Sequence, residues 1–241
     1  MPILWFSSYT NTYTNTYNAN GASGTPARTS DSYTTGASSL SLPAVGTMAK
    51  TGYDFAGWSP SPTGSALNNN GYTTTSSLTL HAVWNLKSIN YSYVRGSAGA
   101  TVLTGSDVAT FPSTSTQTGL YGSTITLDSL VTNVINISGN PYQFMGWNDN
   151  NSIYGRADSF TLGASASTFT AQWVRLYEVR YALNGGTGQV DVDDECRELG
   201  NTCRADQNIT LHAAPTRAGY TFAGWKDQSG TVFSAAASTS L

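Results

Sequence analysis

Apolar and polar residues alternate along short stretches of the chain, and the same order of stretches occurs three times. Each copy starts with an opening segment that alternates aromatic or apolar residues with polar ones and ends in a glycine turn. That pattern is typical of a half-buried strand leading into a hairpin. A second segment contains Thr-Leu or Ser-Leu, and an aromatic heptad follows it. The opening segments are TYTNTYNANG (12–21), INYSYVRG (89–96) and YEVRYALNGG (177–186), and the predicted second strands are SLSLPAV (39–45), TITLDSL (124–130) and NITLHAAP (208–215).

The heptad has a partner later in the chain. It reads GYDFAGW at 52–58, PYQFMGW at 141–147 and GYTFAGW at 219–225. Two closing segments, LTLHAVW and STFTAQW, each end in a tryptophan that lies 26 residues after the heptad tryptophan. This constant spacing predicts that the two tryptophans of a copy belong to one core. The matching position after the third heptad would fall beyond Leu241, so the third copy is expected to lack its closing strand.

These copies divide the chain into sequence repeats. We expect an N-terminal extension at 1–6, a first repeat at 7–85, a second repeat at 86–175 and a third repeat at 176–241. The segments that join the repeats are short, which predicts stiff modules in an elongated array. The fold class expected from these patterns is mainly β, with three tandem small domains and little helix.

The heptad cannot be a regular strand if all its aromatic residues face one core. Alternation places Tyr53 and Phe55 on one face and would turn Trp58 to the other. Gly57 suggests a β-bulge that turns the tryptophan inward, and Gly146 and Gly224 hold the same place. The predicted core signature is Tyr53, Phe55, Gly57, Trp58, Trp84, Tyr142, Phe144, Gly146, Trp147, Trp173, Tyr220, Phe222, Gly224 and Trp225.

The amino-acid composition limits the kinds of partner that we expect this chain to bind. Charged residues are 10% of the chain, against about 25% in an average soluble protein, so Ser, Thr, Asn and Gly must supply the polar surface. The net charge is −3 and the basic residues are scattered, so no nucleic-acid partner is expected. No apolar run reaches 18 residues, and we expect no membrane span.

The combined order of opening strand, NGG turn, Thr-Leu strand, P-T-x-x-GYTFAGW, polar loop and T-x-x-A-x-W resembles the Listeria–Bacteroides repeat, the B-repeat type of internalin B. APTRAGYTFAGW (214–225) carries the resemblance almost residue for residue, and PYQFMGW departs from it most. The resemblance implies β-grasp-like domains used in tandem as stalks or adhesive modules of bacterial surface proteins. It also implies an extracellular location and no enzymatic activity or cofactor.

Candidate chemical sites are few. Asp191, Asp193, Asp194 and Glu195 crowd one segment and are weak calcium candidates, although the EF-hand order is absent and a solvated acidic loop is the alternative. Cys196 and Cys203 are the only cysteines, and they flank a short turn-rich sequence. In a secreted protein they predict a disulfide rather than a zinc or redox site. The two histidines occupy different places in their repeats and support no catalytic triad.

Three functions remain open at this point. The first is a stalk or adhesin built of tandem β repeats. The second is an adhesin that binds a host or neighbouring-cell glycan or protein through loops of the second or third repeat. The third is a surface filament subunit in which segment 3–10 of one copy completes the third repeat of the next. The alternative is a monomer, in which the missing strand only means that the sequence is part of a longer protein. Tyrosines outside the core signature are candidates for stacking on sugars, namely Tyr9, Tyr13, Tyr17, Tyr72, Tyr121 and Tyr154.

Overall fold

The computed structural model describes residues 10–37, 40–67, 75–108, 111–130, 133–189 and 202–240. Across these ranges all regular secondary structure is β, as the sequence predicts. The chain divides into two compact units. The N-terminal unit comprises Met1–Asn90, Thr118–Ile125 and Thr161–Ala166, and the C-terminal unit comprises Tyr91–Gln117, Thr126–Phe160 and Ser167–Leu241.

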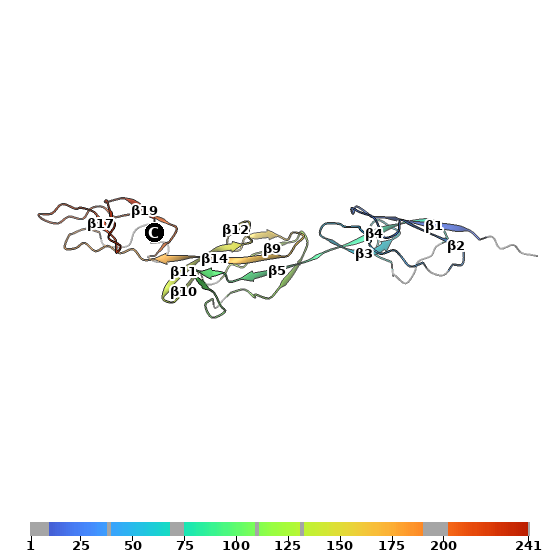
Figure 1. The fold of residues 1–241 in the computed structure, drawn as a ribbon, viewed down its shortest axis with the longest axis horizontal. Coiled ribbons are helices and arrows are strands. Elements are labelled where there is room, and N and C mark those ends of the chain that lie inside the picture. Colours follow the sequence, from blue (N-terminus) through green and yellow to red (C-terminus); the bar gives the residue numbers. More distant parts are fainter. Residues whose placement is uncertain are drawn as a thin grey trace, which may run out of the picture. The chain divides into compact units, whose positions relative to one another are not determined.

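One four-stranded sheet holds the first repeat, in the order β2-β1-β4-β3. Its strands are β1 (Thr12–Asn18), β2 (Ser30–Thr34), β3 (Tyr53–Ser59) and β4 (Leu78–Leu86). Figure 1 labels these four strands. The closing strand β4 is central, parallel to the opening strand β1 and antiparallel to the heptad strand β3. Leu80 and Ala82 face the core and are fully buried, as the alternation in LTLHAVW requires.

The second repeat contributes most of a seven-stranded sheet, in the order β10-β11-β14-β5-β8, with β12 beside β11 and β15 beside β14. Its central closing strand, β14, runs parallel to β5 and antiparallel to the heptad strand β11, so the arrangement of the first sheet is repeated. The strands are β5 (Ser88–Val94), β8 (Gln117–Leu120), β10 (Val134–Ile137), β11 (Asn140–Asn148), β12 (Ile153–Tyr154), β14 (Ser167–Tyr177) and β15 (Cys203–Arg204).

Short antiparallel pairs complete the fold. The Thr-Leu segments of the second and third repeats form β9 and β16, each paired with a later strand. The pairs are β6 (Ser97–Ala98) with β7 (Thr101–Val102), β9 (Thr124–Thr126) with β13 (Ser159–Thr161), β16 (Asn208–Thr210) with β19 (Ser238–Ser240), and β17 (Trp225–Lys226) with β18 (Val232–Phe233).

The predicted second strand of the first repeat is wrong. Residues 41–45 lie outside the named strands, and the opening strand pairs instead with β2. Pro43 stands in the middle of this segment, and proline cannot donate a backbone hydrogen bond to a ladder.

Both complete heptads contain the bulge that their glycine predicts. The register shifts between Phe55 and Gly57 in β3, and between Phe144 and Gly146 in β11. Gly57 has φ of 135° and Gly146 has φ of 143°, in a region that side chains other than glycine rarely adopt. The bulge brings the next residue inward, so Trp58 and Trp147 are 1% and 0% exposed.

The third repeat has the opening and heptad segments but pairs them differently. Segments 178–183 and 219–224 lie outside the named strands, so the opening strand predicted at 177–186 is wrong beyond Tyr177. In the other repeats these segments pair with a central closing strand, and among the described residues of the third repeat no strand pairs with both of them. A smaller core remains, in which Ile209, Leu211 and Cys203 pack with Tyr181 and Trp225.

Candidate functional site

Each repeat builds the same cluster of aromatic rings around its heptad tryptophan, which we call the aromatic clamp. The tyrosine of the opening segment packs against this tryptophan, and so does the heptad phenylalanine. The Tyr–Trp centroid distances are 4.8 Å for Tyr17–Trp58, 4.7 Å for Tyr93–Trp147 and 4.7 Å for Tyr181–Trp225. The Phe–Trp distances are 5.5 Å for Phe55–Trp58, 5.1 Å for Phe144–Trp147 and 5.2 Å for Phe222–Trp225.

A closing tryptophan completes the clamp in the first two repeats. Trp84 lies edge-on to Phe55 at 5.5 Å, and Trp173 lies edge-on to Phe144 at 5.4 Å. Edge-to-face pairs at these distances are favourable, each contributing about 0.5–1.5 kcal/mol beyond burial. The phenylalanine therefore contacts both indoles of its repeat.

Indole N–H groups fix the clamp to the backbone at equivalent places. Each heptad tryptophan donates to the carbonyl of the residue directly after a buried leucine of the second segment. The acceptors are Pro43 for Trp58 at 2.7 Å, Asp128 for Trp147 at 2.7 Å and His212 for Trp225 at 2.9 Å. Closing tryptophans donate just after the opening strand, Trp84 to Ala19 at 3.0 Å and Trp173 to Arg95 at 2.8 Å.

The hydroxyl of the clamp tyrosine has a different hydrogen-bond partner in the first repeat. In the second and third repeats its hydroxyl accepts the backbone N–H of Asp128 or His212, at 3.3 Å in both cases. Pro43 holds that place in the first repeat and has no N–H to donate. The Tyr17 hydroxyl instead donates to Asp31 Oδ2 at 2.7 Å.

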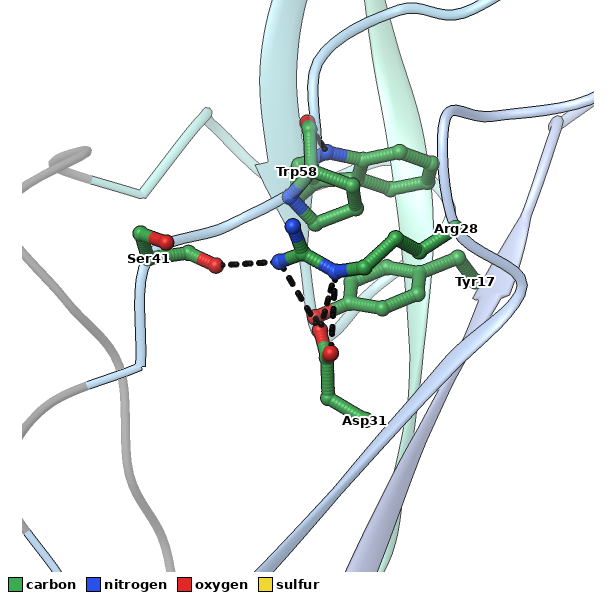
Figure 2. A network of polar contacts seen from close by, with 6 residues as sticks. Tyr17, Arg28, Asp31, Ser41 and Trp58 are labelled. Carbon is green, nitrogen blue, oxygen red and sulfur yellow. Dashed lines mark hydrogen bonds and ion pairs between the residues drawn. The ribbon is translucent and has the colours of Figure 1, made fainter.

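An ion pair supports this substitute bond, as Figure 2 shows. Arg28 donates from Nε to Asp31 Oδ1 at 2.9 Å and from Nη2 to Asp31 Oδ2 at 3.1 Å. Arg28 Nη2 also reaches the carbonyl of Ser41 at 2.7 Å. This network connects β1, β2 and the segment before Pro43, and its role is structural.

Burial changes the acidity of the clamp tyrosines. The pKa of Tyr17 is raised, first by burial and then by its hydrogen bond to Asp31. Burial also raises the pKa of Tyr93. The hydrogen bond to Asp31 raises the pKa of Arg28. All three groups therefore keep their ordinary neutral-pH charge states, and none is prepared for proton transfer near neutral pH.

A groove of about 860 Å³ lies beside the clamp of the third repeat. Residues of segments 178–184 and 220–228 line it, and so do Ile209 and Leu211. Trp225 is half-buried there, while Tyr220 is 68% exposed. The repeat pattern predicts that this repeat lacks a strand, but it does not locate the groove that these two segments line.

The family model of the Listeria-Bacteroides repeat domain matches residues 13–83 and 177–240, which are more than half of the chain. The chain belongs to the Listeria-Bacteroides repeat family. The two matched segments contain the opening segment and the heptad of the first and third repeats.

Two further likenesses are weaker than the match to the Listeria-Bacteroides repeat. A protein of Evansella cellulosilytica named "Putative Gly-rich membrane protein" is 27% identical over 193 residues, which are 75% of this chain and 20% of that protein. The structure of Streptococcal High Identity Repeats in Tandem (SHIRT) domains 3-4 from a cell surface protein is 14% identical and covers 67% of this chain and 96% of its own. Its TM-score is 0.27, and at that score the likeness supports neither a shared fold nor a shared function.

The tyrosines of the Listeria-Bacteroides repeats occupy different environments. Tyr142 is buried, while Tyr53 is half-buried and lies edge-on to Tyr121 at 6.2 Å. The prediction of Tyr17 as a sugar-stacking residue is wrong, because its ring is buried against Trp58. Tyr13 and Tyr154 are half-buried, and Tyr9 and Tyr72 lie outside the described residues.

The candidates for metal binding and disulfide formation fall mostly outside the described residues. Asp191, Asp193, Asp194, Glu195 and Cys196 all lie there. Cys203 is described; it is buried and disulfide-bonded. In the ranges that the structure describes, no three His, Cys, Asp or Glu side chains are grouped closely enough to hold a metal ion.

Two remaining features bear on catalysis and membrane association. His81 is half-buried in β4, whereas His212 stacks on Tyr181 at 4.0 Å in the third repeat. Each therefore belongs to a different sheet or core. Within the described ranges, no helix has the length and apolar character needed to span a bilayer.

Proposed function

We propose that the chain is a non-enzymatic part of a bacterial cell-surface protein, in which the tandem repeats act as a stalk or adhesive spacer. The observation that supports this most strongly is the use of the repeated motif. Trp58 and Trp147 are buried, and all five indole N–H groups of the motif bind backbone carbonyls of their own repeat. A motif used in this way specifies a fold and leaves little of its aromatic surface for a ligand.

Composition and relatives support the same proposal. A low-charge surface rich in Ser, Thr and Asn suits an exposed module that is not built to attract ions or nucleic acid. The Evansella relative is named as a membrane protein, and this chain spans a fifth of its length. A repeat module that occupies a small part of a long membrane-associated protein fits a spacer role.

A stretching experiment on the full chain tests the spacer role. The chain would be held between marker domains and pulled in an atomic force microscope. In the first two repeats the closing strand is paired on both sides, so we expect reproducible unfolding peaks, with a length gain of about 3.3–3.6 Å per residue released. Smooth extension without force peaks would contradict a load-bearing role.

A binding screen separates the spacer from an adhesin that uses specific loops. The full chain would be tested against arrays of glycans and matrix proteins, with the Trp58→Ala variant as the matched control. The spacer role predicts no saturable ligand up to about 100 μM, a range in which even weak specific binding is detected. A saturable ligand bound equally by both forms would place recognition in the loops and would overturn the spacer as the main role.

A further inference from the structure

One turn of the second repeat packs on the first repeat. Segments 118–125 and 161–166 lie in the second repeat by sequence and group with the first repeat in the N-terminal unit. Gly122 donates its backbone N–H to the Leu162 carbonyl, and Leu162 donates its own N–H to the Ser123 carbonyl, both at 2.9 Å. Segment 118–125, which we call the joint segment, is therefore held by backbone bonds within that unit.

Lys87 connects the joint segment to the first heptad through the backbone. Tyr121 donates its N–H to the Lys87 carbonyl, and Lys87 donates its N–H to the Gly52 carbonyl, both at 2.9 Å. Gly52 directly precedes β3, the heptad strand of the first repeat. A single residue between β4 and β5 thus binds both the first heptad and a turn of the second repeat.

The ring of Tyr121 lies directly against Gly52. A Cβ atom added at Gly52 would lie 2.1 Å from Cδ1 of this ring and 2.3 Å from Cε1 and Cγ. Gly52 is buried and has φ of 77°. Glycine is therefore needed here for two reasons, the backbone conformation and the close approach of the ring. The same ring also lies edge-on to Tyr53 at 6.2 Å.

The third repeat has an equivalent turn without the ring. In this turn Gln207 donates its N–H to the Arg204 carbonyl at 3.0 Å, and Ala205 donates its N–H to the Arg175 carbonyl at 2.8 Å. Ala205 holds the place of Tyr121, three residues before the strand that contains the Thr-Leu motif or leads into it. The turn and its backbone bond therefore do not require an aromatic residue, so the contact of Tyr121 with Gly52 has another role.

We propose that Tyr121 couples the unfolding of the joint segment to that of the first repeat. Its ring keeps water from the two backbone bonds of Lys87, and hydrogen bonds shielded from water are harder to open. When the first repeat unfolds, the joint segment loses both the ring contact and its carbonyl partner, and it opens at the same time. This inference goes beyond the spacer role and does not depend on it.

Hydrogen exchange of the full chain, resolved by segment, tests the coupling. Trp58→Ala destabilises the first repeat without touching the joint segment. We expect exchange in 118–125 to become at least about ten-fold faster together with β3, while exchange in β11 stays within about two-fold of the wild type. An unchanged rate in 118–125 would overturn the proposal, and so would an equal acceleration in β11, which would make the whole chain one cooperative unit.

A pair of glycine variants separates the ring contact from backbone strain. Gly52→Ala places a methyl group against Tyr121. Gly36→Ala is the matched control in the same unit, because Gly36 has φ of 81° and a Cβ there would meet nothing within 4 Å. We expect Gly52→Ala to accelerate exchange in 118–125 at least about ten-fold more than Gly36→Ala does. Equal effects would leave strain as the only cause and would overturn the role of the ring.

Replacing the tyrosine tests the residue pair directly. Tyr121→Ala should accelerate exchange in 118–125 about ten-fold, whereas Tyr121→Phe keeps the ring and should behave as the wild type. In the double variant Gly52→Ala/Tyr121→Ala the added methyl meets no ring, so its effect should be smaller than the product of the two single effects. A double variant that equals this product would show that the two residues act independently and would overturn the proposal.

Discussion

The first and third repeats share an aromatic clamp but not the sheet around it. Their Tyr–Trp and Phe–Trp distances agree to within 0.3 Å, and both heptad indoles bind a carbonyl in the segment before the heptad. Yet Trp58 is buried and Trp225 is only half-buried. The difference is β4, because the described residues of the third repeat include no strand that pairs with both its opening and its heptad segment.

This comparison separates two levels of structure. In the third repeat the rings of the clamp keep their distances beside only the short pairs β16–β19 and β17–β18. In the first repeat, full burial of the heptad tryptophan goes with a closing strand that lies about 60 residues from the opening strand, as the contact between Thr16 and Thr79 illustrates. The clamp is therefore the more local device, and the closing strand converts it into a sheet.

The largest effect is expected from removing a clamp tryptophan. Trp58→Ala should destabilise the N-terminal unit by about 3–5 kcal/mol, the usual cost of deleting a buried large aromatic side chain. Trp225→Ala should cost about 1–3 kcal/mol, because less apolar surface leaves water at this half-buried site. Segment-resolved hydrogen exchange in the wild type and both variants measures the two losses. Equal losses would break the comparison.

The bulge glycines give the next largest effect. Gly57→Ala should cost about 1–3 kcal/mol, because alanine at φ of 135° is strained. Gly146→Ala should cost more, since a Cβ there would lie 2.3 Å from the Tyr154 carbonyl oxygen, whereas at Gly57 it meets only the Ala66 methyl at 3.0 Å. Thermal denaturation followed by circular dichroism checks the order. Gly163→Ala, with open space around it, is the neutral control.

Alkaline pH should produce a smaller and reversible loss. Tyr17 and Tyr93 have pKa values raised above the ordinary value of about 10, so the folded state favours their neutral forms. The stability linked to them is complete below pH 10 and falls as the pH rises from 10 towards the folded-state values. Denaturation midpoints between pH 8 and about 11 measure this trend. Tyr17→Phe should flatten the part that belongs to the N-terminal unit, and an unchanged slope would contradict the assignment.

The smallest effect is expected at Asp31, whose carboxylate binds the Tyr17 hydroxyl where the other repeats use a backbone N–H. Asp31→Asn should cost about 0.5–1.5 kcal/mol, because it weakens a partly exposed pair with Arg28 and the bond from Tyr17. Asp128→Asn is the matched control, since Tyr93 is bound by the backbone N–H of that residue. Urea denaturation compares the two variants. A larger loss in Asp128→Asn would contradict the role assigned to Pro43.

Much of the fold follows from patterns in the sequence. The 26-residue spacing between tryptophans pointed to one core, and Trp58 and Trp84 do both pack against Phe55 in one cluster. Gly57 predicted a bulge because the heptad breaks alternation, and the register shifts at that place. These features are local or periodic, so the chain displays them directly.

Other features depend on contacts that no local pattern encodes. The parallel pairing of β1 with β4 is non-local. Segment 178–183 has the same alternation but no such partner among the described residues, and it is not a strand. Tyr17 resembled a surface tyrosine because its partner, Trp58, lies far away in the sequence. The carbonyl acceptors of the indoles are backbone atoms, so no side chain marks them. Pro43 became informative only once Asp128 and His212 were seen to donate their N–H groups to the clamp tyrosines.

The central claim is that the closing strand turns the aromatic clamp into a protected sheet. Hydrogen exchange of the full chain at neutral pH tests this claim most directly. The heptad amides of β3 should exchange at least about 100-fold more slowly than those of 219–224, because only the former are paired to a central strand. Equal protection of the two heptads would contradict the account.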